Sequence, residues 1–311
     1  MNIKGKKLFD IIYGLVLVAF TVYLLLDTFV IARVYEDVAP GQENVGILDP
    51  TQAPTQPTQP TTDSPSPVVT DRSYSDGNIS IVITEYREYD TTIYVADVKL
   101  SSPDYLRTAL ARGSYGKNVT QKTSEMARDN GAIFAVNGDY YGSREKGYVL
   151  RNGVLYRSVG SSNQEDLVIY ADGSFEIITE KSVSAEELLD AGAQQILSFG
   201  PALIIDGQIS VTDRDEVGKA MASNPRTGIG IVDDLHYVFV VSDGRTRGSK
   251  GLSLRELADF MQALGAKIAY NLDGGGSSTM VFNGEVINQP TTNGKSMRER
   301  SVSDIVCIGY E

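Results

Sequence analysis

The sequence predicts an α+β fold with a mixed, largely antiparallel β-sheet and a few packed helices, preceded by one transmembrane helix and a Pro/Thr-rich linker. Three observations carry this prediction. An apolar run fills most of the first 32 residues, and seven of the chain's 11 prolines fall between residues 40 and 70. Beyond them, short β-rich runs alternate with Asx-Gly turns, a pattern typical of antiparallel hairpins.

The N-terminal segment is expected to be an uncleaved signal-anchor. Residues 1–7 carry three lysines and form the predicted cytoplasmic tail, and residues 8–32 form the predicted transmembrane anchor. At about 1.5 Å rise per residue, the stretch 11–32 covers the roughly 30 Å hydrocarbon core, which would leave the following domain extracytoplasmic. A cleaved signal peptide is the alternative, but it needs a shorter apolar core and a small-x-small cleavage site that residues 31–36 lack.

A disordered linker is expected over residues 33–73, and one compact domain over residues 74–311. The proline-rich part of the linker shows no apolar periodicity. It cannot bury enough apolar surface to offset its chain entropy, so an extended stalk is predicted. No fixed-period repeat and no second linker divides the rest of the chain.

Within the domain, each element is predicted from its local pattern. Apolar alternation between turns predicts strands at residues 78–86, 91–100, 132–137, 266–272, 279–287 and 303–310. Asx-Gly or Asp-Asp turns predict hairpins over residues 148–158, 167–178, 202–210 and 227–244. Helices are predicted at residues 124–132, 184–192 and 253–266. The last of them has a capping box of Ser253 and Glu256 and a terminating Gly265.

Composition excludes several classes of protein. The single cysteine, Cys307, permits no internal disulfide and no Cys-based zinc or iron–sulfur site, and the single histidine, His236, permits no His-rich metal site. We interpret Cys307 as a core thiol and His236 as a structural strand residue. A net charge of −12 repels phosphate backbones, so nucleic acid is not an expected partner. No cofactor and no resident metal are expected.

Polar clusters follow five of the predicted strands, at residues 137–142, 199–201, 224–227, 242–245 and 271–278. The last cluster places Gly274, Gly275 and Gly276 directly after an apolar strand, where glycines weaken a sheet but let the backbone approach a ligand closely. Their N–H groups can converge on an anion. Neither a lysine nor a long helix follows, which excludes Walker and Rossmann loops. A plain flexible turn is the competing interpretation.

Charged side chains in these clusters indicate an anionic substrate. Arg226 and Arg245 are suited to bind phosphate or carboxylate through paired hydrogen bonds, although a surface ion pair is the commonest fate of an arginine. Asp139, Asp243 and Asp273 each follow an apolar strand. A buried carboxylate there can act as acid, base or nucleophile, and glycoside cleavage uses two of them. Ordinary turn chemistry is the alternative, which we assign to the Asp-Gly turns of the predicted hairpins.

The ordered set of motifs resembles the phosphodiester glycosidase family. The resemblance covers about residues 78–310 and rests on AVNGDYYG, FGPALI, NPRTGIGI, VVSDGR, SLRELADFMQALGA, NLDGGGSSTMVFNG and RSVSDIVCIG. It implies hydrolysis of a sugar-1-phosphodiester, which releases the sugar and leaves a phosphomonoester. Because the family includes bacterial proteins labelled as exopolysaccharide-biosynthesis proteins, a glycosyl phosphate of the cell envelope is the expected substrate.

The resemblance also implies a set of site residues. These are Asn137, Asp139, Arg226, Asp243, Arg245, Asp273, Gly274, Gly275 and Gly276, with Ser277 next to them. We expect Asp273 and Asp139 to be the catalytic carboxylates and Asp243 to be their orienting partner. The two arginines and the glycine amides would hold the phosphate, and the Asn and Ser side chains would contact the substrate.

Two further classes of function stay open at this point. A non-catalytic binding module for anionic cell-wall glycans would use the same phosphate-holding groups without an acid–base pair. A metal-dependent phosphodiesterase would use Asp139, Asp243 and Asp273 as oxygen ligands for a hard cation. The sequence offers no histidine to assist such a metal site.

Overall fold

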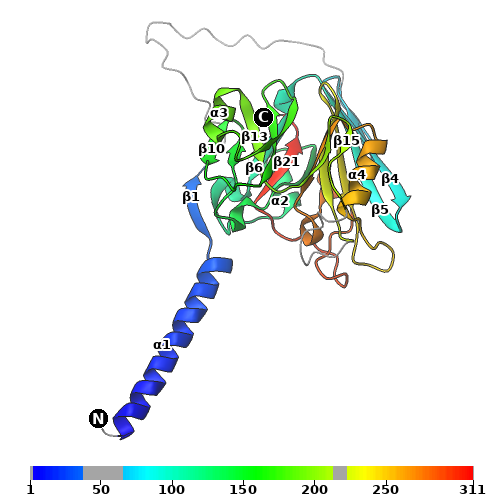
Figure 1. The fold of residues 1–311 in the computed structure, drawn as a ribbon. Helices are drawn as coiled ribbons and strands as arrows, with labels where there is room; N and C mark the ends of the chain where they lie inside the picture. Colours follow the sequence, from blue (N-terminus) through cyan, green and yellow to red (C-terminus); the bar gives the residue numbers. More distant parts are fainter. Residues whose placement is uncertain (1–2, 38–65, 213–222, 311) are drawn as a thin grey trace, which may run out of the picture.

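A computed structural model describes residues 3–37, 66–212 and 223–310, and it confirms the predicted fold class (Figure 1). Its strands form one sheet of nine strands, two of five and one of two. The pairs within these sheets are antiparallel. Four α-helices are described, and three of them pack on the sheets of the domain.

The N-terminal helix α1 (Ile3–Phe29) projects away from the domain in Figure 1. Its stretch Ile11–Phe29 is long and apolar enough to cross a membrane, a property that signal sequences share. The helix ends at Phe29, and strand β1 (Arg33–Asp37) begins after three intervening residues.

The nine-stranded sheet has the order β15-β14-β18-β16-β17-β5-β4-β3-β2. Its strands are β2 (Val68–Val69), β3 (Ser73–Ser75), β4 (Ile79–Glu88), β5 (Thr91–Leu100), β14 (Ala202–Ile205), β15 (Gln208–Ile209), β16 (Thr227–Asp233), β17 (His236–Ser242) and β18 (Ile268–Leu272). Helix α4 (Leu254–Ala263) covers one face. Its predicted capping box is confirmed, since the Ser253 hydroxyl accepts from the Glu256 amide at 3.0 Å.

Two five-stranded sheets complete the domain. One has the order β20-β19-β8-β21-β6, from β6 (Leu106–Leu110), β8 (Phe134–Asn137), β19 (Met280–Phe282), β20 (Glu285–Val286) and β21 (Asp304–Ile308), with helix α2 (Thr123–Asp129) against it. The other has the order β10-β9-β13-β11-β12, from β9 (Val149–Arg151), β10 (Val154–Arg157), β11 (Glu165–Tyr170), β12 (Phe175–Thr179) and β13 (Ala193–Leu197), with helix α3 (Ala185–Asp190) against it. Short 3₁₀ turns lie at Pro103–Tyr105, Ala111–Gly113, Tyr141–Ser143 and Gly275–Ser277.

The core lies between the sheets, and strand β17 shows how its sequence serves two faces. Tyr237 and Phe239 join the core cluster shared with the two smaller sheets, whereas Val238 and Val240 join the cluster under α4. Side chains alternate between faces with a period of two, so a strand buried on both faces is apolar throughout. The predicted hairpins are confirmed as the pairs β9–β10, β11–β12, β14–β15 and β16–β17.

The expected linker has different ends in the structure. Residues 33–37 form β1, which pairs with β7 (Ser114–Lys117), and β2 and β3 extend the edge of the nine-stranded sheet. Strand pairing therefore joins both ends of the expected linker to the domain, and a ring contact of Tyr35 adds to it at β1. The proline content of the chain between these ends does not predict this pairing. Residues 38–65, where the extended stalk is predicted, lie outside the described residues.

Strand β1 lies unusually close to β7 because residue 116 is a glycine. A Cβ atom at Gly116 would overlap the carbonyl oxygen of Arg33 and would lie 2.9 Å from the Cα of Val34. The ring of Tyr35 packs on Tyr115 with 5.9 Å between centroids. Any larger residue at position 116 must therefore displace β1.

We predict that Gly116→Ala detaches β1 and exposes the bond after Arg33 to trypsin. In the full chain in detergent, the new N-terminus at Val34 should appear several-fold faster than in the unsubstituted protein, as measured by mass spectrometry. Gly248→Ala is the control, because its Cβ would meet only the Thr246 hydroxyl, at 4.0 Å. Equal cleavage rates in all three proteins would contradict the close β1–β7 contact.

Candidate active site

The structure brings the five polar clusters to one edge of the domain. Thr227 at the start of β16 pairs with Leu272 at the end of β18 and with Val241 near the end of β17. The loops that leave these strands are therefore neighbours. Cluster 199–201 joins them through the Asn271 side chain, which donates to the Gly200 carbonyl at 2.7 Å.

Asn137, at the end of β8, forms hydrogen bonds that connect the loops of this edge. Its Nδ2 donates to the Asp273 carbonyl at 2.6 Å, and its Oδ1 accepts from the Thr227 hydroxyl at 2.9 Å and from the Thr279 amide at 3.2 Å. The side chain is fully buried. Its amide is used inside the protein, so Asn137 holds the loops in position, and its expected contact with substrate stays a prediction.

Asp273 has the environment of a reactive carboxyl. Its Oδ2 accepts from the Ser277 hydroxyl at 2.5 Å and from Arg300 Nη2 at 3.0 Å. Burial raises the pKa of Asp273 above its ordinary value, while the positive charge of Arg300 opposes the rise. The side chain of Arg300 is 41% exposed and that of Asp273 is 10% exposed, so Asp273 is largely buried and only Arg300 reaches the surface.

Arg245 and Arg300 place two positive charges next to each other. Arg245 donates from Nε and Nη2 to Asn224 Oδ1 at 3.2 and 3.0 Å, and from Nη1 to the Thr292 carbonyl at 2.6 Å. Burial and the charge of Arg300 lower the pKa of Arg245. An anion between the two guanidinium groups would relieve their repulsion, which makes this the natural place for a phosphate.

Sequence reasoning assigned no role to Arg300. The motif RSVSDIVCIG contains it, but the residue lies in a polar loop with no strand or glycine signal beside it. Only the fold shows that the loop before β21 brings its side chain onto Asp273 and Ser277.

Arg226 lies in the protein interior. It is 4% exposed, and its Nε donates to the Leu252 carbonyl at 3.0 Å. Its backbone amide donates to the Ser242 hydroxyl at 2.9 Å. These bonds hold the segment before β16 in place, next to the pairing of Asn224 with Leu252.

The three glycines serve close packing. A Cβ atom at Gly274 would lie 2.9 Å from the Pro225 carbonyl oxygen, and one at Gly275, where φ is +64°, would lie 2.8 Å from Arg245 Nη2. At Gly276 it would overlap the Thr292 hydroxyl. The Gly275 amide donates to the Pro225 carbonyl at 2.8 Å, and the anion-binding role expected of the three glycine amides stays a prediction.

Asp139 belongs to a buried ion cluster. Its Oδ2 accepts from Arg151 Nη2 at 2.8 Å and from the Ser198 amide at 2.9 Å, and its Oδ1 accepts from the Tyr141 amide at 2.9 Å. Arg151 also pairs with Asp304 at 2.7 Å. Both oxygens of Asp139 are occupied and the residue is 1% exposed, which favours a positioning role; the expected catalytic role of Asp139 stays a prediction.

The second carboxyl of this cluster carries a perturbed pKa. Burial raises the pKa of Asp304 to about 8, and the negative charge of Asp139 adds to this rise while the positive charge of Arg151 opposes it. Asp243 is also buried, and its Oδ1 accepts from the Gln289 amide at 2.7 Å. Burial raises the pKa of Asp243, and its bond positions the chain that leads to Arg300.

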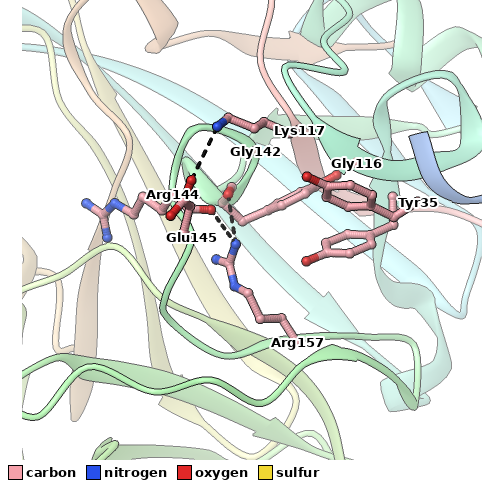
Figure 2. Close-up of a pocket in the computed structure, with 9 residues that line it drawn as sticks. Tyr35, Gly116, Lys117, Gly142, Arg144, Glu145 and Arg157 are labelled. Carbon is pink, nitrogen blue, oxygen red and sulfur yellow. Dashed lines mark hydrogen bonds and ion pairs between the residues drawn. The ribbon is translucent and has the colours of Figure 1, made fainter. Parts of the chain in front are cut away.

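A separate pocket of about 190 Å³ lies beside β1 (Figure 2). It is lined by Tyr35, Tyr115, Gly116, Lys117, Tyr141, Gly142, Arg144, Glu145 and Arg157. Figure 2 shows Lys117 directed at Glu145 and Arg157 directed at the backbone near Arg144. None of the ten predicted site residues lines this pocket.

Two guanidinium groups beside one buried carboxyl, on an antiparallel α+β domain, are the features of a protein that handles an anionic ligand. The chain belongs to the phosphodiester glycosidase family, whose model matches residues 130–309. Phosphodiester glycosidases are hydrolases.

Curated relatives are similar over part of their length. A prophage-derived uncharacterized protein YomE of Bacillus subtilis is 27% identical over 201 residues, which cover 63% of this chain and 31% of that protein. The N-acetylglucosamine-1-phosphodiester alpha-N-acetylglucosaminidase of Bos taurus is 28% identical over 232 residues, covering 67% of this chain and 43% of the relative. The chain thus spans less than half the length of these relatives.

Solved structures show the same fold. The zebrafish N-acetylglucosamine-1-phosphodiester alpha-N-acetylglucosaminidase catalytic domain, auto-inhibited by its pro-peptide, has a TM-score of 0.59 at 20% identity and covers 75% of this chain and 83% of that one. A hypothetical protein from Synechocystis has a TM-score of 0.55 at 15% identity, with coverage of 74% and 62%.

Arg151→Met tests the buried ion cluster. We expect it to lower the free energy of unfolding by about 3–5 kcal/mol, because Asp139 and Asp304 would lose the positive charge of Arg151 while still buried. Near-UV circular dichroism of the chain's 17 tyrosines during urea unfolding measures the change. Arg128→Met is the matched control, with an expected change of about 0.5 kcal/mol or less, because that side chain is 71% exposed.

Proposed function

We propose that this protein is a membrane-anchored, extracytoplasmic hydrolase that cleaves a sugar-1-phosphodiester in cell-envelope or exopolysaccharide metabolism. The observation that carries the proposal is the Asp273–Arg300 pair with Arg245 beside it, in a chain of the phosphodiester glycosidase family. The names of the mammalian relatives support a sugar-1-phosphodiester as substrate, with N-acetylglucosamine as the first sugar to try.

The reaction adds water across the bond between the anomeric carbon and the bridging oxygen. The sugar leaves with the hydroxyl of the water, and the phosphodiester becomes a phosphomonoester. The phosphate starts with one negative charge and ends with nearly two, because the second pKa of a phosphomonoester is about 6. Groups that bind the growing charge stabilise the transition state more than the substrate. Arg245 and Arg300 are our candidates for these groups.

Asp273 is our candidate for the general acid. The acid must lie next to the bridging oxygen and hence next to the phosphate, and Asp273 contacts one of the two phosphate-binding candidates directly. Its raised pKa keeps more of it protonated than an ordinary aspartate at the same pH. Asn137, Asp139, Asp243 and Arg226 act in this proposal as positioning residues, and Ser277 holds the Asp273 carboxyl.

The membrane anchor of the proposal is α1. The three lysines of residues 1–7 favour a cytoplasmic N-terminus, and the stretch Ile11–Phe29 is long enough to span the bilayer. Only three residues separate the helix from β1, which supports an anchor over a cleaved signal peptide, because the paired strand leaves little extended chain for cleavage.

The two other classes of function make different demands on the site. A metal-dependent phosphodiesterase needs free carboxylate oxygens, whereas both oxygens of Asp139 accept hydrogen bonds from protein groups. Among the residues that the structure describes, no group of three or more His, Cys, Asp or Glu side chains is arranged to hold a metal ion. A binding module would not need the raised pKa of Asp273.

Turnover is tested with the full chain in detergent and a panel of synthetic glycosyl phosphodiesters. We expect Asp273→Asn to reduce kcat by about 100- to 10,000-fold, the usual contribution of a general acid. Asp172→Asn, in the β11–β12 turn, should leave kcat unchanged, and EDTA should have no effect.

Three results would contradict the proposal. Equal turnover by the parent protein and Asp273→Asn excludes the assigned acid. Binding without turnover, unaffected by that substitution, favours a binding module. Loss of activity in EDTA favours the metal-dependent enzyme.

The pH dependence of kcat/KM gives a second test. If the protonated form of Asp273 is active, the rate is highest at low pH and falls as pH rises through its pKa. Arg300 stabilises the carboxylate, so its removal raises that pKa further. Arg300→Gln should therefore shift the alkaline limb to higher pH, in addition to lowering the rate. Arg298→Gln, which removes the same charge two residues away, should not shift it. A limb that moves to lower pH in Arg300→Gln would contradict the assignment.

A further inference from the structure

Two unusually basic segments lie beside the candidate site, and one of their cations, Lys250, pairs with Asp90 at 3.1 Å. Residues 244–250 and 291–300 contain six cationic side chains and one acidic side chain, in a chain with a net charge of −12. The cations are Arg245, Arg247, Lys250, Lys295, Arg298 and Arg300, and all six residues are exposed. The one acid, Glu299, turns inward, and its Oε1 accepts from the Ser124 amide at 2.9 Å. We call these two segments the basic loops.

The basic loops form one continuous surface. Arg245 of the first loop donates to the Thr292 carbonyl of the second at 2.6 Å. A Cβ atom at Gly294 would overlap the carbonyl oxygen of Arg245, so the two backbones touch. Arg300 extends the surface to Asp273 at 3.0 Å. Any anionic layer that contacts the loops therefore also lies next to the Asp273–Arg300 pair.

An apolar side chain stands at the tip of the second loop. Met297 is 50% exposed, and its neighbours along the chain include Lys295 and Arg298. A backbone bridge between Thr291 and Met297 holds the tip in shape. An exposed apolar side chain surrounded by cations is typical of segments that lie in the interface of an anionic bilayer.

The loops face the same side of the domain as the membrane helix. Strand β21 begins at Asp304, just after the second basic loop, and its arrow in Figure 1 points toward the C-terminus at the top. In the same view, helix α1 runs downward from the lower side of the domain. The orange-red loop before β21 extends from this lower side as well. The site and α1 therefore share one side.

The connection between α1 and the domain is short and is held by strand pairing and hydrogen bonds. Strand β1 follows α1 after three residues and pairs with β7. The side chain of Asn118, after β7, donates to the carbonyls of Thr28 and Ile31 at 3.2 and 3.1 Å. Residues 38–65 join β1 to β2, which are both parts of the domain, so that segment does not separate the domain from α1.

We propose that the basic loops dock on the anionic lipid surface of the membrane that α1 crosses, and that the site acts on glycosyl phosphates presented at that surface. This inference rests on the proposed membrane anchor and names the setting of the proposed substrate. The charge of the loops is opposite to that of the partner, and the short connection keeps them within reach of it.

The test places a fluorescent label on the loop tip. Cys307 is 1% exposed, so Met297→Cys provides a single reactive thiol in the full chain. The labelled protein is reconstituted in nanodiscs of neutral lipid, or of neutral lipid with a third of anionic phosphatidylglycerol, each containing a spin-labelled lipid as quencher. Asp234→Cys is the control label, because the β16–β17 turn lies at the far end of β17, about 20 Å from the site.

We expect at least twofold stronger quenching at position 297 in anionic than in neutral nanodiscs, with the difference lost in 1 M salt. The control label should show no quenching in either. Equal quenching at position 297 in both lipids, quenching of both labels alike, or failure of the chain to incorporate into nanodiscs would overturn the proposal.

A charge-reversal variant separates this proposal from the proposed hydrolysis. Lys295→Glu combined with Arg298→Glu should abolish the difference in quenching and raise KM at least tenfold for a lipid-linked diester. The same variant should leave kcat/KM for a short soluble diester unchanged. An unchanged KM for the lipid-linked diester would overturn the docking. Absence of turnover of any diester, with the quenching as expected, would contradict the hydrolysis and leave the docking surface supported.

Discussion

The candidate site depends on one buried interaction, the ion cluster of Arg151 with Asp139 and Asp304. Arg151 ends strand β9, Asp139 follows strand β8, and Asp304 begins strand β21, so the cluster joins the two five-stranded sheets directly beneath the site. Because Asp304 is fixed, Arg300 reaches Asp273 from a loop only three residues long. Breaking a buried charge pair costs much free energy, so this cluster holds the neighbouring site residues in fixed positions.

Local patterns predicted much of the fold. The Ser253–Glu256 capping box and the Asn152–Gly153 turn act over two to four residues, so the sequence alone is sufficient to predict them. The glycine cluster also pointed to the correct edge of the domain. The close contacts of Gly275 come from Arg245 and Pro225, which are distant in the sequence, so no local pattern predicts them.

The missed features share a physical cause. Arg151 meets Asp304 across 153 residues, and β1 meets β7 across about 80, so no local window contains both partners. The hydrogen-bond partners of the aspartates also come from distant parts of the chain. Asp139 accepts from Arg151 and from the Ser198 amide, whereas the buried Asp273 pairs with the exposed Arg300. The membrane docking that we propose for the basic loops depends on the same kind of long-range contact, since the pairing of β1 with β7 joins α1 to the domain.

In the proposed reaction, the bond to the anomeric carbon breaks while the guanidinium groups of Arg245 and Arg300 hold the phosphate. Hydrolysis in water enriched in oxygen-18, followed by phosphorus NMR of the phosphomonoester, tests it most directly. We predict that cleavage of the bond between the anomeric carbon and the bridging oxygen leaves the phosphate without oxygen-18. Incorporation of oxygen-18 into the phosphate would mean attack at phosphorus and would contradict it.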